Sequence, residues 1–312
     1  MNIVQRILKG DKRGIARLIT LIEEQSPDAS HLLKKIYRFT GNAVTIGITG
    51  PPGAGKSSIV NLLAKKFRQK NKKVGIIAID PTSPFTGGAI LGDRIRMQNL
   101  TLDEGIFIRS MGSRGALGGL SRASYDAVKV LDAAGMDYII IETVGVGQSE
   151  VDIIKLADIV ALVLVPGMGD EVQAIKAGVM EIGDIFVVNK SDRDGSDRLV
   201  TEIQMNLDLN PNKNDIKPPI IKTVAVTGEG VEELAKTIDQ VFHQILNNDM
   251  LIKKRKERIK QELQELIRKI HLNQIISTFE AKIEDFSDKI LKKEIDPYTA
   301  ANAILKSEKI MF

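Results

Sequence analysis

The stretch "GPPGAGKSS", from Gly50 to Ser58, carries the clearest chemistry in the sequence. It fits the pattern G-x-x-x-x-G-K-[ST] and stands between an apolar, strand-like run and a helical run. Glycines let the backbone wrap around phosphates, while the lysine spans two phosphates and the hydroxyl binds magnesium. We predict these two roles for Lys56 and Ser57, because a purely structural turn would not require them. The other predicted nucleotide contacts in this loop are Gly53, Ala54, Gly55 and Ser58.

The run "VVNKSD", which ends at Asp192, matches the guanine-reading pattern N-K-x-D. Asp192 can accept hydrogen bonds from the ring N–H and the exocyclic amine of guanine, which adenine does not present in that arrangement. Lys190 can lie over the base, and Asn189 can tie its loop to the phosphate loop. A polar helix cap is the alternative, but the position after a phosphate loop favours GTP over ATP.

The stretch "TVAVTGEG", residues 223–230, follows the last apolar run of the alternating region. We expect its backbone amides to close the other side of the base, with Ala225 as the first candidate. A simple strand-to-helix turn explains the same residues.

The stretch "YIIIETVGVGQSE", residues 138–150, places a carboxylate at the end of an apolar run. Loops at the carboxyl edge of a parallel sheet meet at one site. We therefore expect Glu142 to face magnesium and its waters, and Gly145 to offer its amide to the γ-phosphate. Capping of the following helix is the alternative for Glu142. Asp80 and Asp93 lie at the two ends of a loop that is suited to rearrangement when the nucleotide changes. Alternatively, either aspartate is only a turn residue.

The residue that activates water is not evident in the sequence. Gln148 lies three residues after Gly145, whereas the usual water-orienting glutamine follows that glycine directly. Phosphoryl transfer needs a positioned water and charge compensation. We therefore predict slow intrinsic hydrolysis that a partner accelerates by reshaping the loops.

Hydrophobic periodicity divides the chain into three predicted parts. Residues 1–40 and 247–312 have helical spacing, whereas residues 41–246 alternate short β-rich runs with helical stretches. This alternation predicts a three-layer α/β domain with a mostly parallel sheet. In the last part, "DPYTAANAI" predicts a helix capped by its aspartate, with proline in the first turn.

Composition excludes several classes of protein. The 312 residues are 43% hydrophobic and include no cysteine and three scattered histidines, which argues against a zinc or nickel centre. We expect a cytoplasmic protein without membrane contact, because the N-terminus lacks a signal-peptide core and no run of about 18 apolar residues occurs. The basic run at 253–260 contains no aromatic residue, so we interpret it as a solvated helix face rather than a nucleic-acid site.

Six segments together resemble one family. In chain order they are "LKGDKRGIARLITLIE", "GPPGAGKSS", "DPTSPFTGGAILGDRIRM", "ETVGVGQSE", "PGMGDEVQAIKAG" and "NKSD". They are similar to the MeaB/ArgK-type GTPases, also called methylmalonic aciduria type A proteins, from about residue 5 to 310. The resemblance implies slow hydrolysis of GTP to GDP and a homodimer formed through a C-terminal helical arm. It also implies a chaperone that gates cofactor loading and protects adenosylcobalamin-dependent methylmalonyl-CoA mutase from inactivation.

The same resemblance assigns roles to individual residues. It implies a phosphate and magnesium site formed by Lys56, Ser57, Asp80, Asp93 and Glu142, with catalysis dependent on Lys56, Glu142 and Asp93. It implies a base site formed by Asn189, Lys190 and Asp192. Residues 166–178 would be an additional switch that reports the nucleotide to the mutase. Beyond the α/β core, helical spacing forms an apolar stripe from Ile259, Leu263, Leu266 and Ile270, which must be buried. Packing onto the chain's own core is one option, and the resemblance favours a subunit interface.

Three other functions remain open at this point. An ATPase or kinase serving uptake of basic amino acids conflicts with the guanine motif. A metal-insertion GTPase for hydrogenase or urease shares the α/β core, but the missing cysteines and histidine cluster count against it. A nucleotide-gated scaffold with incidental hydrolysis would carry the same motifs. The sequence also leaves open which acyl-CoA mutase is served.

Overall fold

The computed structural model describes residues 2–80, 98–112, 121–143, 152–167, 179–209 and 217–306. The chain divides into two compact units, residues 1–252 and 253–312.

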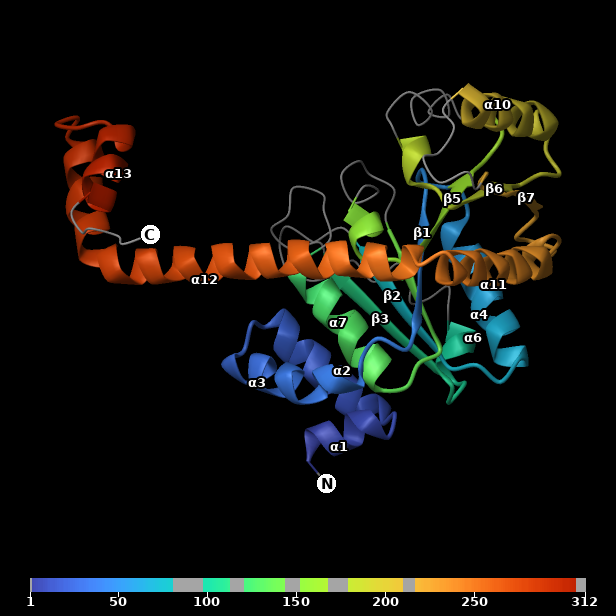
Figure 1. Cartoon of the computed structure of the whole chain (residues 1–312), viewed down its shortest axis with the longest axis horizontal. Helices are drawn as coiled ribbons and strands as arrows, with labels where there is room; N and C mark the ends of the chain where they lie inside the picture. The colour runs from blue at the N-terminus through green and yellow to red at the C-terminus, as the bar shows by residue number, and fades with distance from the viewer. Residues whose placement is uncertain are drawn as a thin grey trace. The chain divides into compact units, whose positions relative to one another are not determined.

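The first unit contains a parallel sheet in the order β3-β2-β4-β1-β5-β6-β7 (Figure 1). The strands are β1 Val44–Thr49, β2 Val74–Asp80, β3 Ile106–Gly112, β4 Tyr138–Glu142, β5 Ile159–Leu164, β6 Ile185–Asn189 and β7 Ile220–Thr223. Each coincides with an apolar run of the sequence, so the predicted α/β fold with a parallel sheet is confirmed. Strand β7 ends at Thr223, because the chain turns at Val224, which forms an isolated antiparallel bridge with Glu229.

The helices in the described ranges are divided between the two units. They are α1 Ile3–Leu8, α2 Lys12–Glu23, α3 Pro27–Ile36, η1 Tyr37–Phe39, α4 Lys56–Gln69, α6 Gln98–Thr101, α7 Arg122–Ala133, η2 Ile153–Lys155, η3 Val179–Ile182, α10 Ser196–Leu209, α11 Val231–Asn247, α12 Met250–Leu291 and α13 Pro297–Lys306. None of the helices in the described ranges is both long and apolar enough to cross a membrane.

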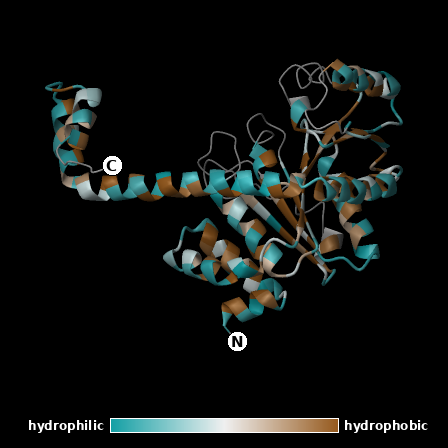
Figure 2. Ribbon diagram, in the orientation of Figure 1, coloured by the Kyte–Doolittle hydropathy of each residue, from teal (hydrophilic) through white to brown (hydrophobic). Residues whose placement is uncertain are grey.

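Alternating strand residues feed separate apolar clusters on the two faces of the sheet. Ile48 and Ile140 belong to a cluster with α4 and α11. Ile139 and Ile141 belong to the cluster that contains α2 and α7. Figure 2 shows hydrophobic residues along the strands between these layers. The packing of the core therefore sets which face of the sheet each strand residue points to, including Glu142 at the end of β4.

The N-terminal helices extend the layer formed by α7. Asp11 caps α2 by accepting a 2.7 Å hydrogen bond from the Gly14 N–H. The buried side of α2 then joins the same apolar cluster as α7, through residues such as Leu18 and Ile19. An ion pair between Glu23 and Arg109 connects α2 to the edge strand β3. These helices thus form part of the first compact unit.

Helix α4 is held against β4 near both of its ends. Close to its C-terminal end, Phe67 stacks on Tyr138, the first residue of β4, with ring centroids 3.9 Å apart. The Tyr138 hydroxyl donates to Asp239 of α11 at 2.7 Å, and burial, followed by this carboxylate, raises the pKa of Tyr138. In the first turn of α4, Ser57 contacts Glu142, the last residue of β4. Together, these two contacts fix the position of α4 along the length of β4.

The second unit contains most of α12 and all of α13. Phe279 of α12 and Ala300 of α13 are buried within the structure. As predicted, Asp296 caps α13, accepting from the N–H groups of Tyr298 at 2.9 Å and Thr299 at 3.0 Å, with Pro297 in the first turn. The Thr299 hydroxyl, followed by these amides, lowers the pKa of Asp296.

Candidate nucleotide site

The phosphate loop connects β1 to α4 and depends on glycine at two close contacts. Gly50 has φ +136°, and a Cβ there would lie 2.1 Å from the Val163 carbonyl oxygen of β5. Gly55 caps α4 with φ +88°, and a Cβ there would lie 2.4 Å from Asn189 Nδ2. The backbone is therefore packed closely against neighbouring strands, and the N-terminus of α4 opens at the loop.

Lys56 begins α4 and is buried beneath the loop. Its Nζ donates to the carbonyl oxygens of Gly50 at 2.8 Å and Pro51 at 3.0 Å. These two contacts hold the ammonium group at the start of the loop. An anion bound in the loop would therefore meet both a fixed positive charge and the helix N-terminus.

Ser57 and Glu142 meet at the carboxyl edge of the sheet. The Ser57 hydroxyl donates to Glu142 Oε1 at 2.6 Å, and the Glu142 side chain is buried. Strand alternation explains the contact, because Glu142 points to the same face as Ile140, toward α4. A hydroxyl and a carboxylate oxygen are the hard donors that magnesium prefers, and magnesium commonly takes its remaining ligands from phosphates and water. The donor set therefore fits this ion.

Asn189 joins three segments of the site. It ends β6, is buried, and its Nδ2 donates to the Ala54 carbonyl oxygen at 2.7 Å. Its Oδ1 accepts from the Ala225 N–H at 3.1 Å and from the Thr223 hydroxyl at 3.2 Å. The tie to the phosphate loop is the one that the sequence predicted. The contribution of Thr223 was not predicted from the sequence.

Lys190 and Asp192 follow Asn189 at the same edge. Lys190 has φ +55°, and its Nζ donates to the Gly53 carbonyl oxygen at 2.8 Å. Asp192 is exposed. On the other side, the Ala225 N–H is engaged by Asn189, and the neighbouring Val226 side chain is 96% exposed. Lys190 and Ala225 therefore lie on two loops that hydrogen bonds connect to the phosphate loop, directly or through Asn189.

Several predicted residues fall outside the described part of the chain. Asp93, Gly145 and Gln148 lie there, as does most of the predicted switch at 166–178. Asp80 is the last residue of β2, at the carboxyl edge of the sheet, but its side chain does not belong to the described part of the structure. Their predicted roles remain predictions.

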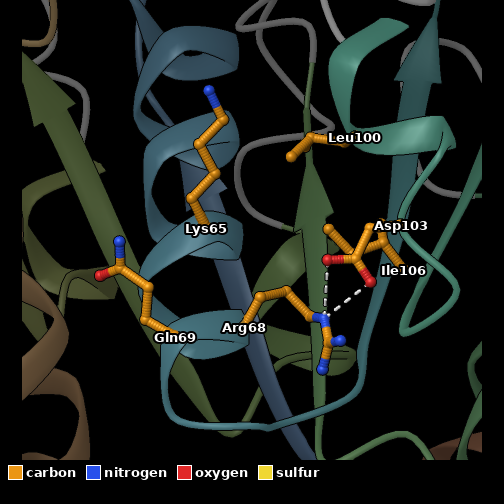
Figure 3. A pocket seen from close by; sticks show the side chains of 6 residues that line it. All are labelled: Lys65, Arg68, Gln69, Leu100, Asp103 and Ile106. Carbon is orange, nitrogen blue, oxygen red and sulfur yellow. Dashed lines mark hydrogen bonds and ion pairs between the residues drawn. The ribbon is translucent and has the colours of Figure 1, made fainter.

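A separate pocket of about 380 Å³ is lined by the C-terminal half of α4 and by the segment from α6 to the start of β3 (Figure 3). It is lined by Lys65, Arg68, Gln69, Leu100, Asp103 and Ile106. Arg68 Nε donates to both carboxylate oxygens of Asp103, at 2.9 and 3.0 Å. This ion pair already balances the charge of the arginine.

A parallel sheet with a glycine-rich loop and Lys-Ser after β1, and Asn-Lys-Ser-Asp after β6, defines the class of P-loop GTPases. The sequence profile described as "Methylmalonyl Co-A mutase-associated GTPase MeaB" matches residues 15–281. The chain belongs to this MeaB family, which confirms the resemblance predicted from six short segments.

Individual relatives agree with this assignment. A Pyrococcus horikoshii protein whose name refers to a GTPase is 52% identical over 308 residues, covering 98% of this chain and 97% of the relative. The Escherichia coli GTPase ArgK is 36% identical, covering 74% and 72%. The mouse mitochondrial "Methylmalonic aciduria type A homolog" is 33% identical, covering 97% and 78%.

A solved structure shares the fold. The crystal structure of a protein described as "LAO/AO transport system kinase" superposes with a TM-score of 0.71 at 24% identity, covering 97% of this chain and 95% of that one. At this identity the similarity supports the architecture alone.

Proposed function

We propose that this chain binds and slowly hydrolyses GTP with magnesium, in the cytoplasm. In this proposal the nucleotide cycle gates cofactor loading and protects an adenosylcobalamin-dependent acyl-CoA mutase. The observation that carries the hydrolytic part is the 2.6 Å contact between Ser57 and Glu142, directly beside the phosphate loop. Family membership supports the mutase part, because the family description names methylmalonyl-CoA mutase. Methylmalonyl-CoA mutase is therefore the first partner to test.

The proposed roles follow from charge and position. Lys56 places a positive charge near the transferring phosphoryl group, which stabilises the charge that develops there. Ser57 and Glu142 would hold magnesium, together with Asp80 and Asp93, and the bound ion would neutralise phosphate charge. Gly145 would offer its amide to the γ-phosphate. Slow turnover is part of the proposal because Gln148 does not directly follow Gly145.

The base would bind between the N-K-S-D segment and the loop after β7. Asp192 would accept from the ring N–H and amine of guanine, and Lys190 would cover one face of the ring. Asn189 supports this role, because it already ties both loops to the phosphate loop. Ala225 remains our candidate for an amide contact to the base, which would require its N–H to be shared with or released by Asn189.

The helical part from residue 247 onward is proposed to be a dimerisation arm. On α12, Ile259, Leu263 and Ile270 are 54–55% exposed, although they are large apolar side chains. Together with the half-buried Leu266 they are spaced by four, three and four residues, the spacing of a coiled-coil seam. Hydrophobic residues recur along α12 in Figure 2. A second copy of the chain could cover this stripe.

The test is phosphate release under single-turnover conditions, with GTP or ATP and with or without magnesium and methylmalonyl-CoA mutase. We expect magnesium-dependent release from GTP, faster with the mutase, and little from ATP. Lys56→Ala should slow release by about a hundredfold or more. Lys65→Ala, on the same helix but exposed and outside the site, is the matched control. Equal hydrolysis of ATP and GTP would instead favour the transport ATPase.

A further inference from the structure

Two buried threonine hydroxyls meet between the phosphate loop and the end of β4. Thr49 is the last residue of β1 and directly precedes Gly50. Thr143 directly follows Glu142, the last residue of β4. Their Oγ1 atoms are 2.8 Å apart, so one hydroxyl donates to the other. The residues are 0% and 1% exposed, which makes this a hydrogen bond shielded from solvent.

The register of the sheet produces this contact. Strands β1 and β4 are parallel neighbours, with Ile48 beside Glu142. The Thr143 N–H then donates to the Ile48 carbonyl oxygen at 3.1 Å. Because the next residue of each segment is a threonine, the pairing of the two strands continues by one residue through side chains.

The threonine pair lies on the opposite face of the sheet from Ser57. Ile140 belongs to the apolar cluster of α4, whereas Ile141 belongs to the cluster of α2 and α7. Alternation thus directs Glu142 toward α4 and Thr143 away from it. Two consecutive residues therefore hold the end of β4 from both faces, Glu142 through Ser57 and Thr143 through Thr49.

We propose that Thr49 and Thr143 are positioning residues for the magnesium site. Their hydrogen bond fixes the Glu142 carboxylate relative to the phosphate loop, and neither side chain is assigned a contact with the nucleotide. The inference rests on the proposed function, because it concerns magnesium held by Ser57 and Glu142. Residues that hold metal ligands in position without binding the metal themselves strongly affect metal affinity and activity.

The hydrogen bond also predicts a distinctive pattern of stability. A buried hydroxyl that loses its partner is costly, whereas replacing both partners by apolar groups of the same shape can be nearly neutral. Thr143→Val and Thr49→Val should each lower the midpoint of thermal unfolding, and the double variant should recover part of that loss. The two valines restore packing but not the hydrogen bond. The double variant therefore distinguishes an effect of lost stability from an effect of lost positioning of Glu142.

The experiment uses the full chain loaded with a fluorescent GDP analogue. Magnesium is titrated while the release rate of the analogue is measured, and GTP turnover is measured in parallel. We expect Thr143→Val, Thr49→Val and the double variant to raise the half-saturating magnesium concentration about tenfold. Thr143→Ser, which keeps the hydroxyl, should stay close to the unmodified protein. Thr237→Val, a buried threonine on α11, is the matched control.

The possible results separate the two proposals. If the unmodified protein responds to magnesium and all the valine variants respond like Thr237→Val, the positioning role is wrong. Failure of Thr143→Ser to keep normal magnesium dependence would also overturn it, since its hydroxyl remains. If release of the analogue from the unmodified protein ignores magnesium, the proposed function itself is overturned.

Discussion

The Asn189 side chain donates from Nδ2 to the Ala54 carbonyl oxygen at 2.7 Å, joining the end of β6 to the phosphate loop. Its Oδ1 accepts a hydrogen bond from the Ala225 N–H at 3.1 Å, so one carboxamide connects the loop after β7 with the phosphate loop. The two loops proposed to hold the base are therefore linked to the phosphate loop through one buried side chain.

Replacing Asn189 by alanine should weaken folding and nucleotide binding together. The change leaves the Ala54 carbonyl and Ala225 amide without this partner, which costs about 1–3 kcal/mol for buried polar groups. Urea unfolding and calorimetry with GDP measure the two effects. Asn302→Ala on an exposed position of α13 is the control. Unchanged GDP affinity in a destabilised Asn189→Ala protein would show that the connection is only structural.

Asp192→Asn should shift nucleotide preference from guanine toward xanthine. In the proposed site the carboxylate would accept two hydrogen bonds from guanine, whereas the amide would offer a donor that matches the additional carbonyl oxygen of xanthine. Competition between GDP and xanthosine diphosphate measures the preference. Asp194→Asn, two residues further on and also exposed, should keep the preference for GDP. Identical preferences in the two variants would contradict the assignment of Asp192.

The Arg68–Asp103 ion pair should make a small contribution to stability that disappears in acid. Hydrogen bonding from Arg68 lowers the pKa of Asp103 below its ordinary value of 3.8. The folded carboxylate therefore loses its proton more readily than the unfolded one, so its stabilising contribution is present above about pH 5 and is lost as pH falls through the lowered pKa.

Asp103→Asn tests this dependence. Both side chains are partly exposed, so we expect a loss of unfolding free energy of about 1 kcal/mol or less at pH 7. The difference from the unmodified protein should shrink as the pH is lowered below 4. Urea unfolding at several pH values measures it. A difference that grows in acid would contradict the assigned direction of the pKa shift.

Glutamates at Leu263 and Leu266 should convert the proposed dimer into monomers. They would place charges at a twofold interface, where each change acts on both subunits. Light scattering should report a monomer that still binds GTP but no longer affects the mutase. Gln264→Glu adds a charge to the same helix outside the stripe and should preserve the dimer. A dimer that survives both leucine changes would refute the role of the stripe.

The sheet and the phosphate loop could be predicted because their signals are local. Strand residues such as Ile46 to Thr49 lie in short apolar runs, and "GPPGAGKSS" specifies its own turn. The meeting of Glu142 with Ser57 followed from the shared edge of a parallel sheet. Only the order of the elements and the alternation of side chains are needed to predict this contact.

Contacts that depend on exact packing were not predictable in the same way. The end of β7 at Thr223 and the engagement of Ala225 by Asn189 depend on how two distant loops approach each other. The Thr49–Thr143 bond depends on the register of β1 with β4, which no periodicity specifies. On α12, helical spacing identified a stripe but did not show that Ile259, Leu263 and Ile270 are each more than half exposed.

The position of β1 in the sheet also constrains the order of folding. Its two neighbours are β4, residues 138–142, and β5, residues 159–164, so β1 cannot be fully paired until a long intervening segment has been synthesised. Closing such long loops precedes any gain from the contacts, and parallel pairings of this kind fold slowly. During translation, the apolar side chains of β1 are therefore synthesised before β4 and β5, the strands that pair with it. Until those strands are made, the nascent chain is prone to aggregation.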